Sequence, residues 1–275
     1  MKVFVFFYNR YETATTSQAL YENNIPHIVL IHSESDLIKF KKGGTLKGDP
    51  VVTKNDKGLA FQRNSALRMM DSGEWAVFMC DDFQRIKSYP KKFILSKTQR
   101  IDVNIENQNA YRLRKEITLS EMFSMFPKLI EIAEANKIHL IGFGLHDNPM
   151  NLGKKFTTRG LADGRFWLVK KSSYEFDVNC QMIDDFCWTA ENLVRHGNVM
   201  VLNWCVPYFE RYTAGGYGST EERKALRKKE CVYLIKKYSP LIRSAEKSGW
   251  DKGTHIKLQA SDGNICKVRK RIGLQ

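Results

Sequence analysis

The chain has 275 residues, of which 43% are hydrophobic and 27% are charged, and its formal net charge is +14. This composition is typical of a folded protein with a sizeable core and argues against a disordered chain. No stretch reaches the roughly 18 apolar residues of a membrane helix, so we expect no membrane span. The basic excess favours an anionic partner, either nucleic acid or an anionic membrane surface, over a basic surface that serves solubility alone.

The six cysteines form no C-x-x-C pair, and no histidine lies at zinc-site spacing from them. We therefore expect free thiols, mostly in the core, and a reducing compartment. The amino-terminal apolar run meets Asn9 and Arg10 too early for a signal peptide. These features predict a cytoplasmic protein.

The first part of the chain alternates strands and helices. Residues 3–7 and 26–32 are apolar runs typical of strands buried on both faces, and a helix is expected over 12–22 between them. A strand, a helix and a strand at this spacing form a βαβ unit. Residues 41–57 are rich in glycine, lysine and aspartate, so we expect an exposed loop there.

Residues 57–83 are the stretch around which the prediction is organised. They predict a helix, a turn and a buried strand that ends in two carboxylates, Asp81 and Asp82. Acidic residues at this position lie where open α/β sheets bind ligands. The helical phase places Arg63 on the apolar face, with Asn64 on the neighbouring flank. Because a buried guanidinium needs a partner, Arg63 should meet either a bound anion or a carboxylate of the protein.

The middle of the chain continues the α/β pattern. Residues 84–118 are polar and irregular, and we expect an insertion on the active-site side. Helical spacing over 119–135 predicts a helix that either kinks at Pro127 or begins there. Further strands are expected at 138–143, 166–169 and 200–203.

A second pair of carboxylates, Asp184 and Asp185, opens a predicted helix that ends at Gly197. One of them could simply cap the helix, but a second acid directly beside the cap gains less from capping. Farther on, Gly215 and Gly216 lie in a glycine-rich loop before a helix expected from about 221 to 238. Such a loop can bind phosphate through its backbone N–H groups, although it matches no phosphate-binding pattern, and a plain loop is an equal alternative.

The carboxyl-terminal part is strongly basic. Residues 221–275 contain 15 Lys and Arg against 6 Asp and Glu, so most of the net positive charge lies there. A small hairpin is expected around Asp262 and Gly263.

Four runs in this chain resemble motifs of glycosyltransferases of the GT-A fold: FYNRYE at 7–12, GLAFQRNSAL at 58–67, WAVFMCDDF at 75–83 and IDDFCWTAENL at 183–193. Their order and spacing look most like the TET-associated glycosyltransferases, found largely in bacteriophages and inferred to add sugars to hydroxymethylated bases in DNA. The resemblance covers about residues 1–240. It implies a Rossmann-like, mixed and mostly parallel α/β sheet flanked by helices. Residues 1–83 would be the nucleotide-sugar half of a domain 1–240, and a basic extension would follow at 241–275.

The resemblance also implies a role for each motif. The nucleotide-sugar site would comprise Tyr8, Asn9, Arg10, Arg63, Asn64 and Asp81, and the glycine-rich loop described above would add Gly215 and Gly216. Asp82, with Asp81, would hold Mg²⁺ or Mn²⁺, and Asp185 would be the general base, with Asp184 as the competing choice. One position departs from the family pattern, because Cys80 stands where the acidic triplet usually begins. A thiol is a poor ligand for Mg²⁺, so Cys80 is expected to pack in the core.

The expected activity is therefore transfer of a sugar, glucose or arabinose, from a UDP-sugar to the hydroxyl of 5-hydroxymethylcytosine in phage DNA. The partners would be modified double-stranded DNA and the nucleotide sugar, without an obligate protein partner, in the host cytoplasm. Aromatic side chains are candidates for stacking on the base, although each is more often part of a core: Trp188, Tyr208, Tyr212 and Tyr217. Two alternatives stay open: transfer to a protein, glycan or lipid, and an inactive DNA-binding module that keeps the fold.

Overall fold

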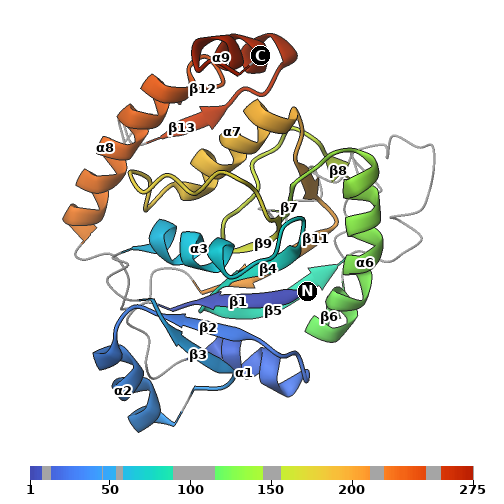
Figure 1. The fold of residues 1–275 in the computed structure, drawn as a ribbon, viewed down its shortest axis with the longest axis vertical. Coiled ribbons are helices and arrows are strands. Elements are labelled where there is room, and N and C mark those ends of the chain that lie inside the picture. Colours follow the sequence, from blue (N-terminus) through green and yellow to red (C-terminus); the bar gives the residue numbers. More distant parts are fainter. Residues whose placement is uncertain are drawn as a thin grey trace.

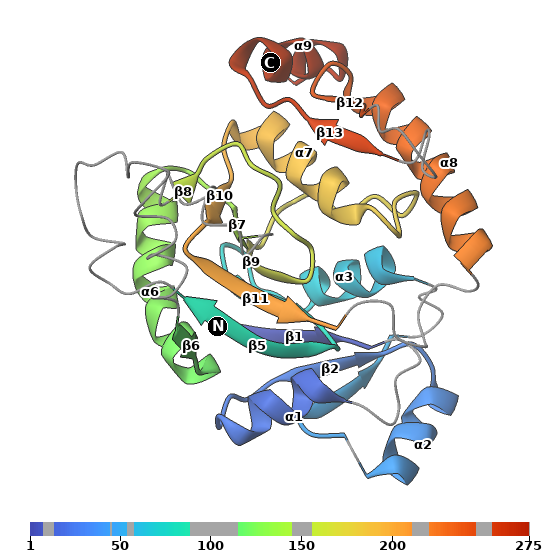
Figure 2. The same cartoon turned by 180° about the vertical axis from the view of Figure 1, so that it is seen from behind.

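The computed structural model describes residues 1–7, 14–44, 46–53, 58–88, 115–144, 156–210, 220–245 and 255–274. In these residues the chain forms an α/β fold with one large sheet between two layers of helices (Figure 1 and Figure 2). No helix in this described part is both long enough and apolar enough to cross a membrane.

Eight described strands form the large sheet: β1 Lys2–Phe6, β2 Ile28–Ile31, β3 Asp49–Val52, β4 Trp75–Cys80, β7 Leu140–Phe143, β8 Phe156–Thr157, β9 Phe166–Lys170 and β10 Met200–Leu202. Their order is β3-β2-β1-β4-β9-β7-β10-β8. Strand β9 runs antiparallel to β4 and β7, and β8 runs antiparallel to β10, whereas the remaining neighbours are parallel. The predicted α/β class with a mixed, mostly parallel sheet is confirmed.

The described helices are α1 Thr15–Glu22, α2 Glu34–Gly43, α3 Leu59–Arg68, α6 Leu119–Ala135, α7 Asp184–His196, α8 Thr220–Tyr238 and α9 Asp262–Arg271. Helices α3 and α7 cover the sheet face that carries Phe4, Phe78 and Trp167, and α8 and α9 extend the same core cluster farther from the sheet, with α9 against α7 (Figure 1). Helices α1, α2 and α6 pack on the face that carries Val5 and Val77. Successive strand residues alternate between the two layers, which explains why the central strands are apolar throughout.

Two smaller sheets accompany the large one. Strands β11 (Cys205–Phe209), β5 (Phe83–Ser88) and β6 (Lys115–Ile117) form an antiparallel sheet, and β12 (Ile242–Ser244) pairs with β13 (Ile256–Leu258). The carboxyl-terminal segment packs into the same core cluster as α7 and α8 through Ile242, Ile265 and Val268. The division of the chain at residue 240 stays a prediction.

Several expectations from the sequence are wrong. Residues 41–57 are not one loop, since they contain the end of α2 and strand β3. Among the described strands β3 lies at the sheet edge, and Pro50 is tolerated there because no described strand beyond it needs the missing N–H. The polar stretch 84–118 contains most of β5 and β6, and its residues 89–114 lie outside the described part of the chain.

Helix boundaries required two further corrections. Residues Asp262 and Gly263 begin α9 rather than a hairpin, with Ser261 as the N-cap that accepts from the Asn264 N–H. Helix α6 continues through Pro127 and does not begin there. It begins at a capping box in which Thr118 and Glu121 satisfy each other's backbone N–H groups.

Candidate active site

The candidate site lies at the carboxyl edge of the large sheet, where β4 ends. Because β9 is antiparallel to β4, the amino end of β9 lies beside the carboxyl end of β4. The Cys80 N–H donates to the Arg165 carbonyl at 2.9 Å. This pairing brings the segment Asp163-Gly164-Arg165 next to the turn formed by Asp81 and Asp82.

The turn that carries Asp81 and Asp82 is hydrogen-bonded to the start of α1. The Thr16 hydroxyl donates to the Cys80 carbonyl at 2.6 Å and accepts from the Phe83 N–H at 2.9 Å. The Thr15 hydroxyl donates to the Asp81 carbonyl at 3.2 Å. The backbone on both sides of the two carboxylates is therefore fixed by side chains from another element.

Arg63 meets a protein carboxylate, as its position on the apolar helix face predicts. Its Nη1 is paired with Asp184, and its Nη2 donates to the Gly164 carbonyl at 2.5 Å. The guanidinium also lies over the Trp167 ring, 4.3 Å from the centroid. Its side chain has no exposed surface, so Arg63 joins α3 to α7 and is shielded from any ligand in solution.

Asn64 also has a structural role. Its amide donates to the Phe176 carbonyl at 2.9 Å and accepts from the Phe176 N–H at 2.6 Å, as a backbone segment would. Gln181 adds a third connection by accepting from the Ala60 N–H at the start of α3. The Arg63-Asn64 pair thus holds α3 against the segment that leads into α7.

The segment before α7 forms a concave run of backbone N–H groups that is filled by Glu230 of α8. This carboxyl group accepts from Gln181, Met182 and Ile183 at 2.8, 2.9 and 3.1 Å. Burial raises the pKa of Glu230, and the three N–H groups oppose that rise. The alternative in which an aspartate caps α7 is wrong, since the N-cap is Ile183 and it makes no side-chain bond.

Asp185 differs from its neighbour Asp184. It is partly exposed, and its carboxylate accepts the Phe186 N–H at 2.8 Å. Burial raises the pKa of Asp185 to about 6, the Asp163 carboxylate adds to the rise, and the guanidinium groups of Arg63 and Arg227 oppose it. A carboxylate with this pKa is suited to accept a proton near neutral pH.

Gly164 explains how these groups pack together. A Cβ at this position would lie 3.2 Å from Asp185 Cβ and 3.2 Å from Arg63 Nη2. A side chain at this position would push Arg63 or Asp185 away by a few tenths of an ångström, so glycine favours the close approach of the β9 entry to α3 and α7.

Asp81 and Asp82 are the oxygen ligands predicted for a divalent metal. Asp81 is buried and Asp82 is partly exposed at the sheet edge. Burial raises the pKa of Cys80 to about 12, and the Asp82 carboxylate adds to the rise, so Cys80 is a neutral thiol. The two carboxylates suit Mg²⁺ or Mn²⁺ and the thiol does not.

Other predicted site residues lie outside the described part of the chain: Tyr8, Asn9, Arg10, Gly215 and Gly216. Tyr212 and Tyr217 lie there as well. Of the other aromatic candidates, Trp188 is 2% exposed and stacks on Phe176 at 3.7 Å within the core. Tyr208 lies on β11 under Arg85 and Lys87.

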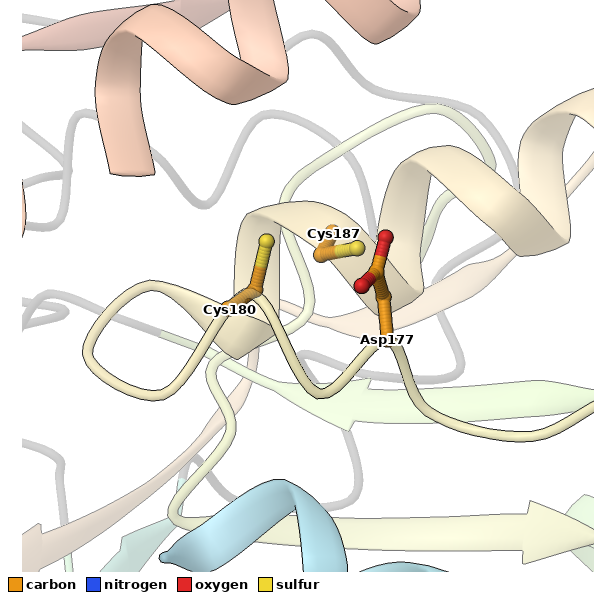
Figure 3. Close-up of side chains that lie close together, drawn as sticks. All are labelled: Asp177, Cys180 and Cys187. Carbon is orange, nitrogen blue, oxygen red and sulfur yellow. The ribbon is translucent and has the colours of Figure 1, made fainter. Parts of the chain in front are cut away.

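A different group of ligand-type side chains lies at Asp177, Cys180 and Cys187 (Figure 3). The Asp177 carboxylate accepts from Tyr233 and Lys237 at 2.6 Å each and from the Asn179 N–H at 3.0 Å. Burial acts to raise the pKa of Asp177, but these hydrogen bonds hold it down at about 2.

These contacts argue against a metal at the Asp177 group. A cation there would compete with the Lys237 ammonium, and zinc normally requires a fourth ligand. A hydrogen bond with Cys187, together with burial, raises the pKa of Cys180, which keeps that thiol protonated. All six cysteines of the chain are free, as expected.

A hollow of about 910 Å³ opens between α1 and the paired strands β5 and β6. Its lining includes Thr15, Gln18, Lys47, Phe83 and Arg85. None of the acidic site residues lines it, so the carboxyl-edge cluster is the better candidate on chemical grounds.

Sequence reasoning missed Asp163, Gly164, Arg165 and Glu230. The only local signal for the first three is an Asp-Gly-Arg turn directly before a buried strand, which has no meaning until β9 is placed beside β4. Comparison with known protein families finds no match, and comparison with curated proteins finds none either.

Proposed function

We propose that this chain is a GT-A-type glycosyltransferase that transfers a sugar from a UDP-sugar to the hydroxyl of 5-hydroxymethylcytosine in DNA. The observation that carries the proposal is Asp185, a partly exposed carboxylate with a pKa raised to about 6 at the sheet edge that holds Asp81 and Asp82. The mostly parallel sheet covered by helices is also the architecture that this proposal expects.

In the proposed reaction the acceptor hydroxyl gives its proton to Asp185. The oxygen of the acceptor hydroxyl then bonds to the anomeric carbon of the sugar. The bond between that carbon and the diphosphate breaks, and UDP leaves. Direct displacement of this kind inverts the anomeric centre. Asp184 is a poorer candidate for the base because its carboxylate is buried and paired with Arg63.

Asp82 and Asp81 are the residues that would hold Mg²⁺ or Mn²⁺. Such ions use one or two carboxylates together with substrate phosphates, and two adjacent carboxylates fit that requirement. When bound, the ion would offset negative charge on the leaving diphosphate. The two threonines at the start of α1 keep the turn in place.

A DNA acceptor is supported by the charge of the carboxyl-terminal elements. Exposed cations on α8, β12, β13 and α9 are Lys228, Lys229, Lys236, Arg243, Lys257, Lys267, Lys270 and Arg271. Phosphate contacts from such side chains supply affinity that does not depend on base sequence and falls with salt.

The decisive experiment measures transfer from several UDP-sugars to hydroxymethylcytosine DNA, to unmodified DNA and to lipid vesicles, with Mg²⁺, with Mn²⁺ and with EDTA. We expect transfer only to the hydroxymethylated DNA, and loss of transfer in Asp185→Asn. Transfer to lipid would move the acceptor class to a membrane surface. Absence of both transfer and UDP-sugar hydrolysis would leave the inactive DNA-binding alternative.

A further inference from the structure

We infer that Arg165, rather than Arg63, is the arginine that binds the diphosphate of the donor. The inference rests on the proposed function, since a diphosphate is the anion which that reaction requires. It assigns a binding role to a residue outside every motif identified in the sequence.

The first argument is access. Both arginines belong to the carboxyl edge, but the side chain of Arg63 is 0% exposed and that of Arg165 is 26% exposed. Contacts with Asp184, Gly164 and the Trp167 ring enclose the Arg63 guanidinium. A ligand could reach Arg63 only by breaking a buried ion pair, which is strongly unfavourable.

The second argument is orientation. Arg165 Nε donates to both Asp163 oxygens at 2.9 Å, and Nη2 donates to the same carboxylate. The guanidinium lies over the Phe209 ring, 5.6 Å from the centroid. Asp163 and Phe209 therefore fix one edge and one face of the group. Nη1 makes no hydrogen bond to any described residue, and this donor remains for an anion.

The third argument is position. The Arg165 carbonyl accepts the Cys80 N–H, so Arg165 lies beside Cys80, the residue directly before Asp81 and Asp82. The preceding residue, Gly164, packs against Asp185. An anion bound by Arg165 would thus lie at the same edge as the proposed metal ligands and the proposed base.

The chemistry of the group fits a diphosphate. A planar guanidinium is always charged and presents parallel N–H donors that match phosphate oxygens. The Asp163 partner lowers the net charge of the pair, but it also keeps the guanidinium from rotating away in the absence of a ligand. Asp163 is a positioning residue in this arrangement.

The test measures binding of UDP and of inorganic pyrophosphate by titration calorimetry, with and without Mg²⁺, to the full chain. Arg165→Gln should weaken both probes about 10- to 100-fold, the usual loss of a charged hydrogen bond, and Arg165→Lys should weaken them less. Arg159→Gln is the matched control, because Arg159 also pairs with an aspartate, Asp262, and is similarly exposed. Thermal unfolding of each variant verifies that it is folded.

The outcomes separate the two claims. Unchanged binding of both probes by folded Arg165→Gln and Arg165→Lys would overturn the inference and leave the glycosyltransferase proposal standing. Arg165-dependent binding of pyrophosphate without binding of UDP would support the anion site and count against a UDP-sugar donor. A wild-type chain that binds neither probe would overturn both.

Discussion

The two ends of α7 carry opposite charge, and only one of them has a charge without a structural explanation. At the carboxyl end, Arg195 pairs with Glu191 at 2.5 Å, and His196 Nε2 lies 3.0 Å from the Tyr174 hydroxyl. Arg269 of α9 donates to the Val194 carbonyl. The Arg269 contact satisfies a backbone carbonyl that a helix end leaves open, and the other two contacts pair side chains of the last turn.

At the amino end, Asp184 forms an ion pair with Arg63. Glu230 accepts hydrogen bonds from the backbone N–H groups that precede the helix. Among the described residues, Asp185 accepts a side-chain hydrogen bond only from the N–H of the next residue, although burial disfavours its charge. Both ends complement the helix dipole, so charge of the right sign is no indication of function. A carboxylate whose pKa burial raises, despite the nearby guanidinium groups, is a better indication of function.

The largest expected effect is on catalysis at the amino end. Asp185→Asn should lower the rate of sugar transfer by about 10²- to 10⁴-fold, the usual contribution of a general base. Because the substitution removes a charge that burial disfavours, stability should not fall. Transfer rates and urea unfolding measured together would verify this pairing, and full activity would remove Asp185 from the mechanism.

In contrast to Asp185→Asn, the substitution Asp184→Asn should lower the stability of the fold. It leaves the buried Arg63 guanidinium without its anion, so we expect a loss of about 3–5 kcal/mol in the free energy of unfolding. The double substitution Arg63→Met with Asp184→Asn should recover part of that loss, as a double-mutant cycle would measure. A loss below about 1 kcal/mol in the single variant would mean that the pair does not hold α3 to α7.

The pH dependence of transfer should report the raised pKa of Asp185, which is about 6. A general base works when it is deprotonated, so kcat/KM should rise with pH through about 6 and then level off. In Asp163→Asn the nearby negative charge is gone, the pKa of Asp185 should fall, and the acidic limb should move to lower pH. A limb that stays in place in that variant would show that another group titrates.

At the carboxyl end of α7, His196 should make the free energy of unfolding depend on pH in the acid range. Burial, together with His139 and the neighbouring cations Arg195, Arg269 and Lys170, lowers the pKa of His196 to about 4. Between about 6.5 and 4 the unfolded chain binds a proton that the folded chain does not, so stability falls as pH falls through that window.

His196→Gln removes this titration and keeps a polar partner for Tyr174. Both proteins should lose unfolding free energy between pH 7 and pH 4, and the loss in the His196→Gln variant should be about 1–2 kcal/mol smaller than in wild type. This figure is reduced to allow for solvent screening. Urea unfolding at the two pH values measures the difference. Parallel losses in the two proteins would assign the acid sensitivity to carboxylates.

The smallest expected effect concerns the basic tail. Arg269→Gln removes donors to the Val194 and Arg195 carbonyls and should cost about 1 kcal/mol. Lys270→Gln removes the same charge from an exposed position and should leave stability unchanged. If both variants weaken DNA binding equally, the tail binds DNA through its charge. A loss of stability in the Arg269→Gln variant alone would show that Arg269 also caps α7.

Much of the fold could be predicted because it depends on local pattern. The apolar run of β4 and the helical phase that turns Arg63 inward are visible in short windows. Strand β3 was missed because an edge strand tolerates Pro50 and polar residues that resemble a loop. Strands β5 and β11 were missed because polar or partly exposed residues interrupt their apolar pattern.

The site was less predictable, because its partners are distant in the sequence. Arg63 was expected to meet an anion, but nothing local identifies Asp184, 121 positions away. Arg165 becomes a site residue only through the antiparallel course of β9. The separate fates of Asp184 and Asp185 depend on which carboxylate faces α3, and adjacent residues in a helix point in directions about 100° apart.

Glu230 has a consequence for selectivity. Three consecutive N–H groups before a helix form the kind of concavity that binds phosphate in many proteins, and here a side chain from α8 occupies it. Glu230 therefore excludes an external anion from this group of backbone donors. A phosphate that approaches this face is left with cationic side chains, whose identity can be changed one at a time without altering the backbone.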